Sequence, residues 1–222
     1  MNFAIELVPT PDRIYFPVYD FGQPLSEAIN QANWWEPRTH TVNYYPIDML
    51  SENPCTKEII PVGTPAFVEG FIRRIPEYSF FELSQLLIPD FLDQETYLFS
   101  NKEPADSTDS AGADILSRWR VFIFEDRILD CRCYLGNGFE PPERKFIQRF
   151  VELWKNKPKA MAIDIGVMKN GGNIIIDAQN FMSCQLYGFQ SRYLPSMFAA
   201  GYKFELKNRL AHVGGKMKVS AR

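Results

Sequence analysis

The chain has 222 residues, 45% of them hydrophobic and 23% charged, which is enough to build one domain or two small lobes. Its net charge of −3 and pI near 5.5 argue against a sequence-independent nucleic-acid binder, which needs a basic surface to neutralise phosphates. No run of about 18 apolar residues predicts a membrane span, and the opening MNFAIELV lacks the basic start of a signal peptide, so we expect a cytoplasmic protein.

The first part of the chain alternates predicted strands and helices, which favours a small α/β lobe. Trp34 and Trp35, at the end of the first helix, either pack in a core or lobe interface or form a ligand platform. Strands are expected at residues 3–8, 14–19 and 58–63, and helices at residues 24–35, from Thr64 with Pro65 at its first position, and from Ser79, where Glu82 completes a capping box.

A polar run without apolar periodicity interrupts the pattern at residues 101–112, directly after a short predicted strand at 97–100. Such a run predicts a mobile loop, which makes it the best candidate for a lobe boundary or an active-site flap. We therefore expect an N-terminal lobe at residues 1–95, a C-terminal lobe at 96–205 and a basic tail at 206–222.

A first hairpin is predicted at residues 118–134. If residues 125–127 form its loop, counting outward places Arg120 directly opposite Arg132. Two facing arginines repel each other, and the oxygens of a phosphate suit their guanidinium donors. The alternative is that each arginine lies on the surface and pairs with a nearby acid.

A second hairpin is centred on the dipeptide Asn170-Gly171, the strongest short-range hairpin signal. With this dipeptide as the turn, Asp164 lies opposite Asp177, and Gln179 shares their face. Opposed carboxylates destabilise a sheet unless a cation neutralises them, and Mg²⁺ prefers carboxylate and amide oxygens together with phosphate and water. A three-residue loop that includes the next glycine would instead place the two aspartates on opposite faces, as ordinary strand carboxylates.

The two hairpins together suggest more than either does alone. Residues 143–154 between them predict an amphipathic helix whose apolar stripe packs in a core. The hairpins then offer a doubled positive and a doubled negative site within one half of the chain. This combination matches a nucleoside triphosphate with its metal, because carboxylates hold the cation and arginines hold phosphate oxygens.

The remaining features predict structure rather than chemistry. The four cysteines lack the paired spacings of a zinc site, and we expect buried, reduced thiols. A short helix is predicted at residues 191–200, followed by the basic tail, which we expect to be frayed and solvated.

Seven short motifs carry a family resemblance that covers most of residues 58–190: IPVGTPAFV at 60–68, YLFS at 97–100, WRVF at 119–122, CRCY at 131–134, AIDIGV at 162–167, IDAQ at 176–179 and LYG at 186–188. In these motifs the chain resembles the ATP-grasp proteins, in particular the clade named for its arginines and lysine. The resemblance implies a phage or bacterial protein. It also implies an α/β (α+β), two-lobed ATP-grasp-like fold in which antiparallel hairpins form the nucleotide site beside a small N-terminal α/β lobe.

The activity implied by the resemblance is an ATP- and Mg²⁺-dependent carboxylate–amine ligase that acts through an acylphosphate. Its substrates would be a small-molecule or peptide carboxylate and an amine, and a homo-oligomer is allowed. The site residues that follow from the motifs are Asp164, Asp177 and Gln179 for the metal, Arg120 and Arg132 for phosphate and catalysis, and Phe99, Ser100 and Lys102 for the nucleotide, with backbone groups near the first two meeting adenine.

The sequence departs from the family pattern at three points. Gln179 stands where an Asn is usual, Arg118 replaces an acid, and no lysine occurs between Lys57 and Lys102, so that Arg73, Arg74 or Lys102 would have to contact phosphate in its place. These departures favour an alternative, a degenerate ATP-grasp fold that binds a nucleotide or a protein partner without catalysis. A metal-dependent phosphoesterase is disfavoured, because it usually needs more acids or histidines.

Overall fold

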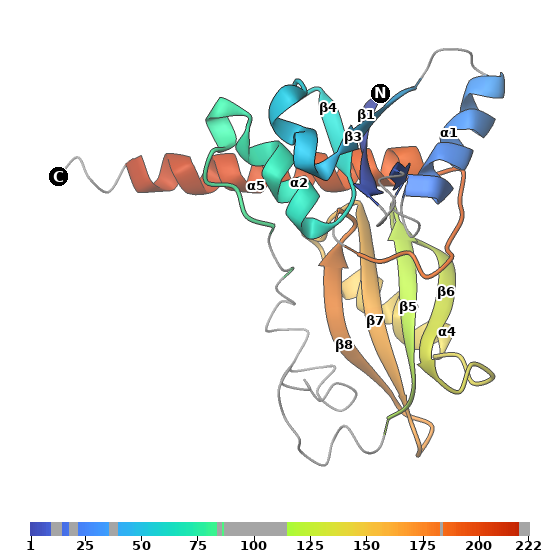
Figure 1. Ribbon diagram of the computed structural model, residues 1–222. Helices are drawn as coiled ribbons and strands as arrows, with labels where there is room; N and C mark the ends of the chain where they lie inside the picture. Colours follow the sequence, from blue (N-terminus) through green and yellow to red (C-terminus); the bar gives the residue numbers. More distant parts are fainter. Residues whose placement is uncertain are drawn as a thin grey trace. The chain divides into compact units, whose positions relative to one another are not determined.

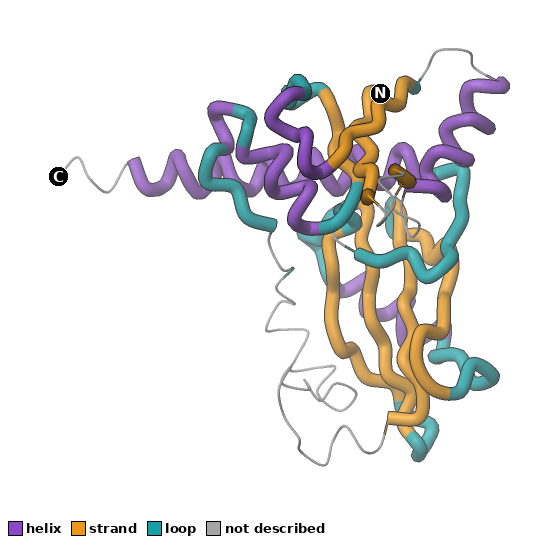
Figure 2. The backbone as a smooth tube through the Cα atoms, viewed as in Figure 1, coloured by secondary structure: helices purple, strands orange, loops and turns teal. Residues whose placement is uncertain are grey.

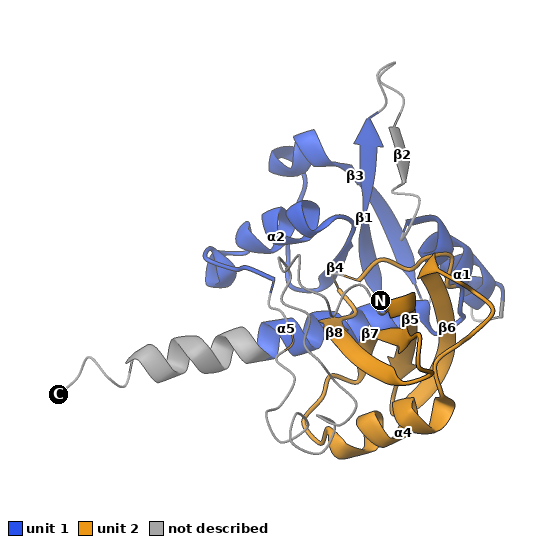
Figure 3. Cartoon of the chain, turned by 90° about the horizontal axis from the view of Figure 1, so that it is seen from below, with its two compact units in different colours: residues 1–84, 190–222 blue, residues 85–189 orange. Residues whose placement is uncertain are grey.

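A computed structural model describes residues 1–9, 15–17, 22–35, 40–83, 86, 115–182 and 184–217. The chain divides into two compact units (Figure 3). Unit 1 comprises residues 1–84 and 190–222, and unit 2 comprises residues 85–189. Each unit has its own sheet, and we describe them separately.

The sheet of unit 1 is built around β1 (Asn2–Pro9) (Figure 1). β1 runs parallel to β3 (Thr41–Pro46) and to β4 (Ile59–Val62), and its last residues pair antiparallel with β2 (Tyr15–Pro17). Phe3, Ala4 and Ile5 in β1 are fully buried, as a central strand with neighbours on both sides requires.

Helices α1 (Gly22–Trp35), α2 (Pro65–Arg73) and α5 (Leu194–Met217) and the 3₁₀ helices η1 (Ile47–Glu52) and η2 (Pro76–Tyr78) complete unit 1. α2 begins as predicted, with Pro65 at its first position and the side chain of Thr64 accepting a hydrogen bond of 3.3 Å from the Phe67 N–H. Its apolar stripe is buried, at Phe67, Val68, Phe71 and Ile72.

The helix predicted from Ser79 is wrong over the described residues, because 79–83 form a turn and irregular chain. Side chains of α2 hold this segment through its backbone: Arg73 Nε donates to the Phe81 carbonyl at 2.6 Å, and Glu69 Oε1 accepts from the Leu83 N–H at 2.9 Å. These long-range bonds outweigh the local capping signal.

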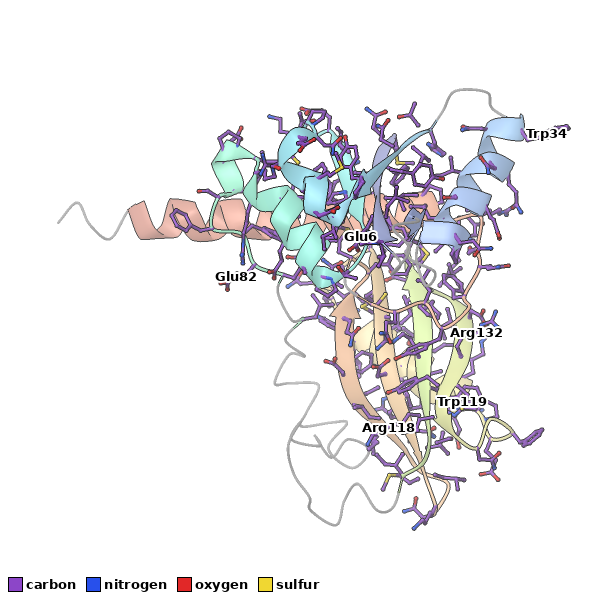
Figure 4. The ribbon with its side chains drawn as sticks, in the orientation of Figure 1. Glu6, Trp34, Glu82, Arg118, Trp119 and Arg132 are labelled. Carbon is purple, nitrogen blue, oxygen red and sulfur yellow. The ribbon has the colours of Figure 1, made fainter. Side chains whose placement is uncertain are left out.

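Two further expectations in unit 1 are corrected. Trp34 does not pack in a core: it is 81% exposed at the end of α1 (Figure 4). The predicted helix at 191–200 is longer, since α5 runs from Leu194 to Met217 and continues into the segment expected to be a frayed tail. That segment contains Leu, Ala and Lys, which are good helix formers.

The described strands of unit 2 form one antiparallel sheet (Figure 2), in which their order is β6-β5-β7-β8 (Figure 1). Its strands are β5 (Ile115–Phe124), β6 (Arg127–Gly136), β7 (Ala160–Met168) and β8 (Asn173–Asn180). Helix α4 (Arg144–Leu153) connects β6 to β7 and lies against the sheet (Figures 1 and 3). Its predicted apolar stripe is confirmed at four of five positions: Ile147, Phe150, Val151 and Trp154 are buried, whereas Phe146 is half-buried.

The β5–β6 hairpin has a shorter loop than predicted. Glu125 and Asp126 form a two-residue turn with φ of 48° and 65°, and Phe124 pairs with Arg127. A β-bulge at Leu129 then inserts one unpaired residue, because Phe122 pairs with Asp130 while Ile123 pairs with Ile128. Loop and bulge compensate, and the predicted pairing of Arg120 with Arg132 is confirmed.

The β7–β8 hairpin shows the same compensation. Its loop is neither the two-residue nor the three-residue loop considered above. The loop comprises residues 169–171, and the Met168 N–H before it donates to the Gly172 carbonyl after it at 2.8 Å. This register alone would place Asp164 opposite Ile176, but a bulge at Ile176 shifts it by one residue. Asp164 consequently pairs with Asp177, as predicted.

The α/β class is confirmed, with a mainly parallel sheet in unit 1 and an antiparallel sheet in unit 2. The division at residues 95/96 and 205/206 stays a prediction; the first boundary, the strand at 97–100 and the loop at 101–112 lie outside the described residues. Among the described helices, none is long and apolar enough to cross a membrane.

Candidate functional site

Four charged residues form a row across the sheet of unit 2. Arg132 on β6 pairs with Arg120 on β5, Arg120 pairs with Asp164 on β7, and Asp164 pairs with Asp177 on β8. Because neighbouring strands lie about 4.8 Å apart, the row is roughly 14 Å long from one end to the other. Its formal charges run plus, plus, minus, minus, so it is neutral as a whole and strongly polar along its length.

A buried ion pair occupies the centre of the row. Arg120 Nε donates to Asp164 Oδ1 at 2.7 Å, and Arg120 Nη2 donates to Oδ2 at 2.6 Å, which is the bidentate fork geometry. The two side chains are only 5% and 8% exposed. Burial alone would lower the pKa of Arg120, but the hydrogen bonds and charge of Asp164 raise it above its ordinary value. The arginine is therefore permanently charged.

Residues 184–189, which we call the covering segment, fold over this pair. The Gln185 carbonyl accepts a hydrogen bond from Arg120 Nη1 at 3.1 Å. The guanidinium carbon of Arg120 lies 5.0 Å from the centre of the Tyr187 ring and 5.9 Å from that of Tyr134. The two tyrosine rings are stacked, with centroids 4.9 Å apart and planes inclined by 10°.

A tight turn shapes the covering segment. Tyr187 and Gly188 both have positive φ, of 46° and 77°, and the Phe189 N–H donates to the Leu186 carbonyl at 2.8 Å. Phe189 stacks on Phe122 of β5 with ring centroids 4.2 Å apart, and anchors the end of the segment. The turn thus holds the Tyr187 ring above the buried ion pair.

The positive end of the row is more open. Arg132, labelled on β6 in Figure 4, has a side chain that is 43% exposed and forms an ion pair of 2.6 Å with Asp130, which is 29% exposed. Asp130 also accepts a hydrogen bond from the Cys131 N–H at 2.8 Å. Sequence reasoning missed Asp130, although its position two residues from Arg132 on one strand already placed both on one face.

The negative end of the row is half-buried and carries the predicted amide. Gln179 Nε2 donates to Asp177 Oδ2 at 2.9 Å, and the Ala178 N–H donates to Asp177 Oδ1 at 2.8 Å. Asp177 and Gln179 lie two positions apart on β8 and therefore share the face of Asp164.

The structure thus brings five of the predicted site residues onto one face of one sheet: Arg120, Arg132, Asp164, Asp177 and Gln179. Phe99, Ser100 and Lys102 lie outside the described residues. The predicted roles of all eight stay predictions.

The comparison with family models finds one domain over this region. Residues 90–195, or 106 of the 222, match the model of an ATP-grasp domain, family 2 of the clade named for its arginines and lysine. This part of the chain is an ATP-grasp domain of that clade. All four strands of the charged row lie within the ATP-grasp domain, as does the covering segment. Residues 60–68, which also carried the resemblance, lie outside it, in β4 and α2 of unit 1.

Solved structures similar to the chain include two proteins of low sequence identity. Macrocyclase MdnB from Microcystis aeruginosa MRC is 10% identical with a TM-score of 0.43, covering 92% of this chain and 98% of its own. ATP-grasp ligase PsnB, solved with a minimal precursor, is 9% identical with a TM-score of 0.41, covering 90% and 98%. No curated protein matches the chain.

The donor groups of the row fit a hard divalent cation together with phosphate. A carboxylate offers about four lone-pair positions, and the Arg120 fork uses two of those on Asp164. Asp177 likewise accepts two hydrogen bonds and has capacity left. Within the described part of the chain, no group of three or more His, Cys, Asp or Glu residues could hold a metal alone. Two carboxylates and an amide instead suit Mg²⁺, which keeps waters and phosphate oxygens as further ligands.

Proposed function

We propose that the protein is an ATP- and Mg²⁺-dependent carboxylate–amine ligase, acting on a small-molecule or peptide carboxylate and an amine. The observation that carries the proposal is the polar row of two arginines and two aspartates inside an ATP-grasp domain. A magnesium nucleotide has the complementary arrangement, with a cation beside an extended anion, so the order of charges in the row matches it.

In this proposal, Asp164, Asp177 and Gln179 hold the cation at the negative end of the row. When bound, Mg²⁺ would neutralise the β and γ phosphate oxygens. Gln179 now turns its amide nitrogen towards Asp177, so its oxygen can join the carboxylates only if the amide rotates. Arg132 at the positive end can reach phosphate oxygens by leaving Asp130, because both side chains are partly solvated.

The reaction that follows has two steps. An oxygen of the substrate carboxylate attacks the γ-phosphorus, forming an acylphosphate and releasing ADP. The amine then attacks the acyl carbon, and inorganic phosphate and a proton leave. The protein's contribution is positioning and counter-charge, so no side-chain nucleophile is required. Backbone groups at Phe99 and Ser100 are proposed for adenine, and Lys102 for phosphate.

The second candidate is a domain that binds a nucleotide or a protein partner without turnover. It is favoured by the absence of lysine between positions 57 and 102 of the sequence. The two candidates share the nucleotide site and differ in chemistry. A cytoplasmic location, a homo-oligomer and a phage or bacterial origin stay predictions.

Calorimetric titration with ATP, with and without Mg²⁺, tests the proposal. Asp177→Asn is the better variant than one at Asp164, because Asp164 is bound in the buried ion pair and its loss would threaten the fold. We expect Mg²⁺ to strengthen ATP binding and Asp177→Asn to remove most of that gain. Asp126→Asn is the matched control: it removes one carboxylate from the same sheet, at a turn position with positive φ that Asn tolerates.

Failure of ATP to bind under either condition would refute the nucleotide site. If Mg²⁺-ATP binds, a screen for ADP release with amines and carboxylates separates the two candidates. A ligase is expected to lose turnover in Asp177→Asn, whereas no turnover in the wild type with any substrate pair would favour the binding domain.

A further inference from the structure

Arg120 already has a partner within the protein for each of its nitrogen atoms. Nε and Nη2 donate to Asp164, and Nη1 donates to the Gln185 carbonyl. The whole residue is 4% exposed. The sequence predicts that Arg120, facing a second arginine, contacts phosphate. In the structure, however, Asp164 binds one side of its guanidinium and the covering segment lies over it.

We propose that Arg120 is a positioning residue that orients the carboxylate of Asp164 for the cation, that Tyr187 keeps it in place, and that of the two paired arginines Arg132 is the one that meets phosphate. This inference rests on the proposed function, because it takes Asp164 as a cation ligand. It differs from the sequence prediction, in which both arginines hold phosphate.

The cost of leaving the present partner decides between the two arginines. If Arg120 moved to a phosphate in the absence of the cation, Asp164 would remain as an unpaired carboxylate with a side chain only 8% exposed. Burying a charge without a partner is strongly unfavourable. If Arg132 moved, it would leave Asp130 at 29% exposure, where water can solvate the charge. Arg132 can therefore exchange its carboxylate for phosphate, and Arg120 cannot do so without a large penalty.

The fork geometry explains what Arg120 does instead. A guanidinium is planar and rigid, so two parallel hydrogen bonds fix both the position and the rotation of the carboxylate. Strand order places Arg120 on one side of Asp164 and Asp177 on the other. The fork occupies the side towards β5, and the remaining lone pairs of Asp164 are available for an ion shared with β8.

Tyr187 completes this arrangement. It is one of three non-glycine residues with positive φ among the described residues, a conformation that tyrosine rarely adopts. Such a conformation persists where the surroundings impose it, and here the ring is stacked on Tyr134 and lies over Arg120. A ring above the guanidinium and a carbonyl on Nη1 prevent the fork from swinging away from Asp164.

The test is the ratio of ATP affinities measured with Mg²⁺ and with EDTA, which reports cation binding separately from phosphate binding. We expect Arg120→Lys, which keeps the charge but loses the fork, to lower this ratio about tenfold or more while the affinity in EDTA stays unchanged. Tyr187→Gly is expected to do the same, and Tyr187→Phe, which keeps the ring, to behave as the wild type. Arg132→Lys is expected to weaken ATP binding equally in both conditions and to leave the ratio unchanged.

Each variant is first shown by circular dichroism to be folded at the temperature of the titration. A residue that only stabilised the fold would change the melting temperature but not the affinity ratio of the folded protein. The inference is overturned if Arg120→Lys weakens ATP binding in EDTA and leaves the ratio intact, or if Tyr187→Gly has the wild-type ratio. A wild type that does not bind ATP would overturn the proposed function itself, and with it this role of Arg120.

Discussion

Removing the fork of Arg120 should destabilise unit 2 far more than the same substitution at Arg132. Arg120→Met keeps a long unbranched side chain but leaves the carboxylate of Asp164 buried and unpaired. With side chains 5% and 8% exposed, this is a buried pair, and losing one partner of such a pair costs about 3–5 kcal/mol. For a chain of 222 residues, that corresponds to a fall in melting temperature of roughly 6–20 °C.

Arg132→Met is the matched control, because it removes the same group from the neighbouring strand. Its ion pair with Asp130 is 43% and 29% exposed, and pairs in solvent contribute about 0–1 kcal/mol. The double variant Arg120→Met with Asp164→Leu should recover much of the lost stability, since replacing both partners of a buried pair by apolar groups is often nearly neutral.

Urea unfolding followed by tryptophan fluorescence measures these differences. Trp119 on β5 and Trp154 beside α4 are 6% and 4% exposed, so both report on the packing of unit 2. An unfolding free energy of Arg120→Met within about 1 kcal/mol of that of Arg132→Met would refute the reasoning. The buried pair of Arg120 with Asp164 would then contribute no more to stability than the exposed pair of Arg132 with Asp130.

Three further predictions concern other parts of the chain. Gly63→Ala should destabilise unit 1 by about 1–3 kcal/mol in urea unfolding, because an added Cβ would lie 2.6 Å from the Cβ of Glu6. Gly138→Ala should have little effect on stability, because its added Cβ would lie 3.7 Å from the nearest atom, the Cβ of Cys133. Burial raises the pKa of Glu6 above its ordinary 4.5, so the folded state favours the protonated acid. The unfolding free energy should therefore fall as the pH rises from 4.5 through the folded pKa. Glu6→Gln should lose this part of the pH dependence. Burial, reinforced by the charge of Asp130, raises the pKa of Cys131 to about 12, and mass spectrometry should show much slower alkylation of this thiol at pH 8 in the folded chain than in urea. An alkylation rate for Cys131 equal to that of the unfolded chain would contradict the last prediction.

The hairpins show how local sequence determines pairing. Asn170-Gly171 and the turn at Glu125-Asp126 identify the two hairpins, but each loop differs from its prediction by one residue. The facing arginines and the facing aspartates were nevertheless predicted correctly, because a bulge in β6 and another in β8 restore the register. Bulges depend on how a strand twists and packs against its neighbours, so neighbouring residues along the chain do not reveal them.

Local signals also misplaced the segment after α2 and Trp34 of α1. The capping box at Ser79 predicted a helix, but bonds from Arg73 and Glu69 hold residues 81–83 in an irregular path. Trp34 is largely exposed, so the expected packing in a core is wrong, and the alternative of a ligand platform stays a prediction. In the segment after α2, contacts with side chains of α2 decided the outcome, and local sequence patterns report only on near neighbours.

The sequence by itself determined the α/β class, the two hairpins, the amphipathic helix between them and the two like-charged pairs. Only the tertiary structure decided that these pairs form one row, because that depends on β5 pairing with β7, and their facing residues Arg120 and Asp164 are 44 positions apart. The same long-range pairing places the buried carboxylate of Asp164 against Arg120, so that Arg120 is not open to an external anion. Charge type follows from composition, but whether a charge is buried, paired or available follows from which strands meet, and that is set by the packing of the whole unit.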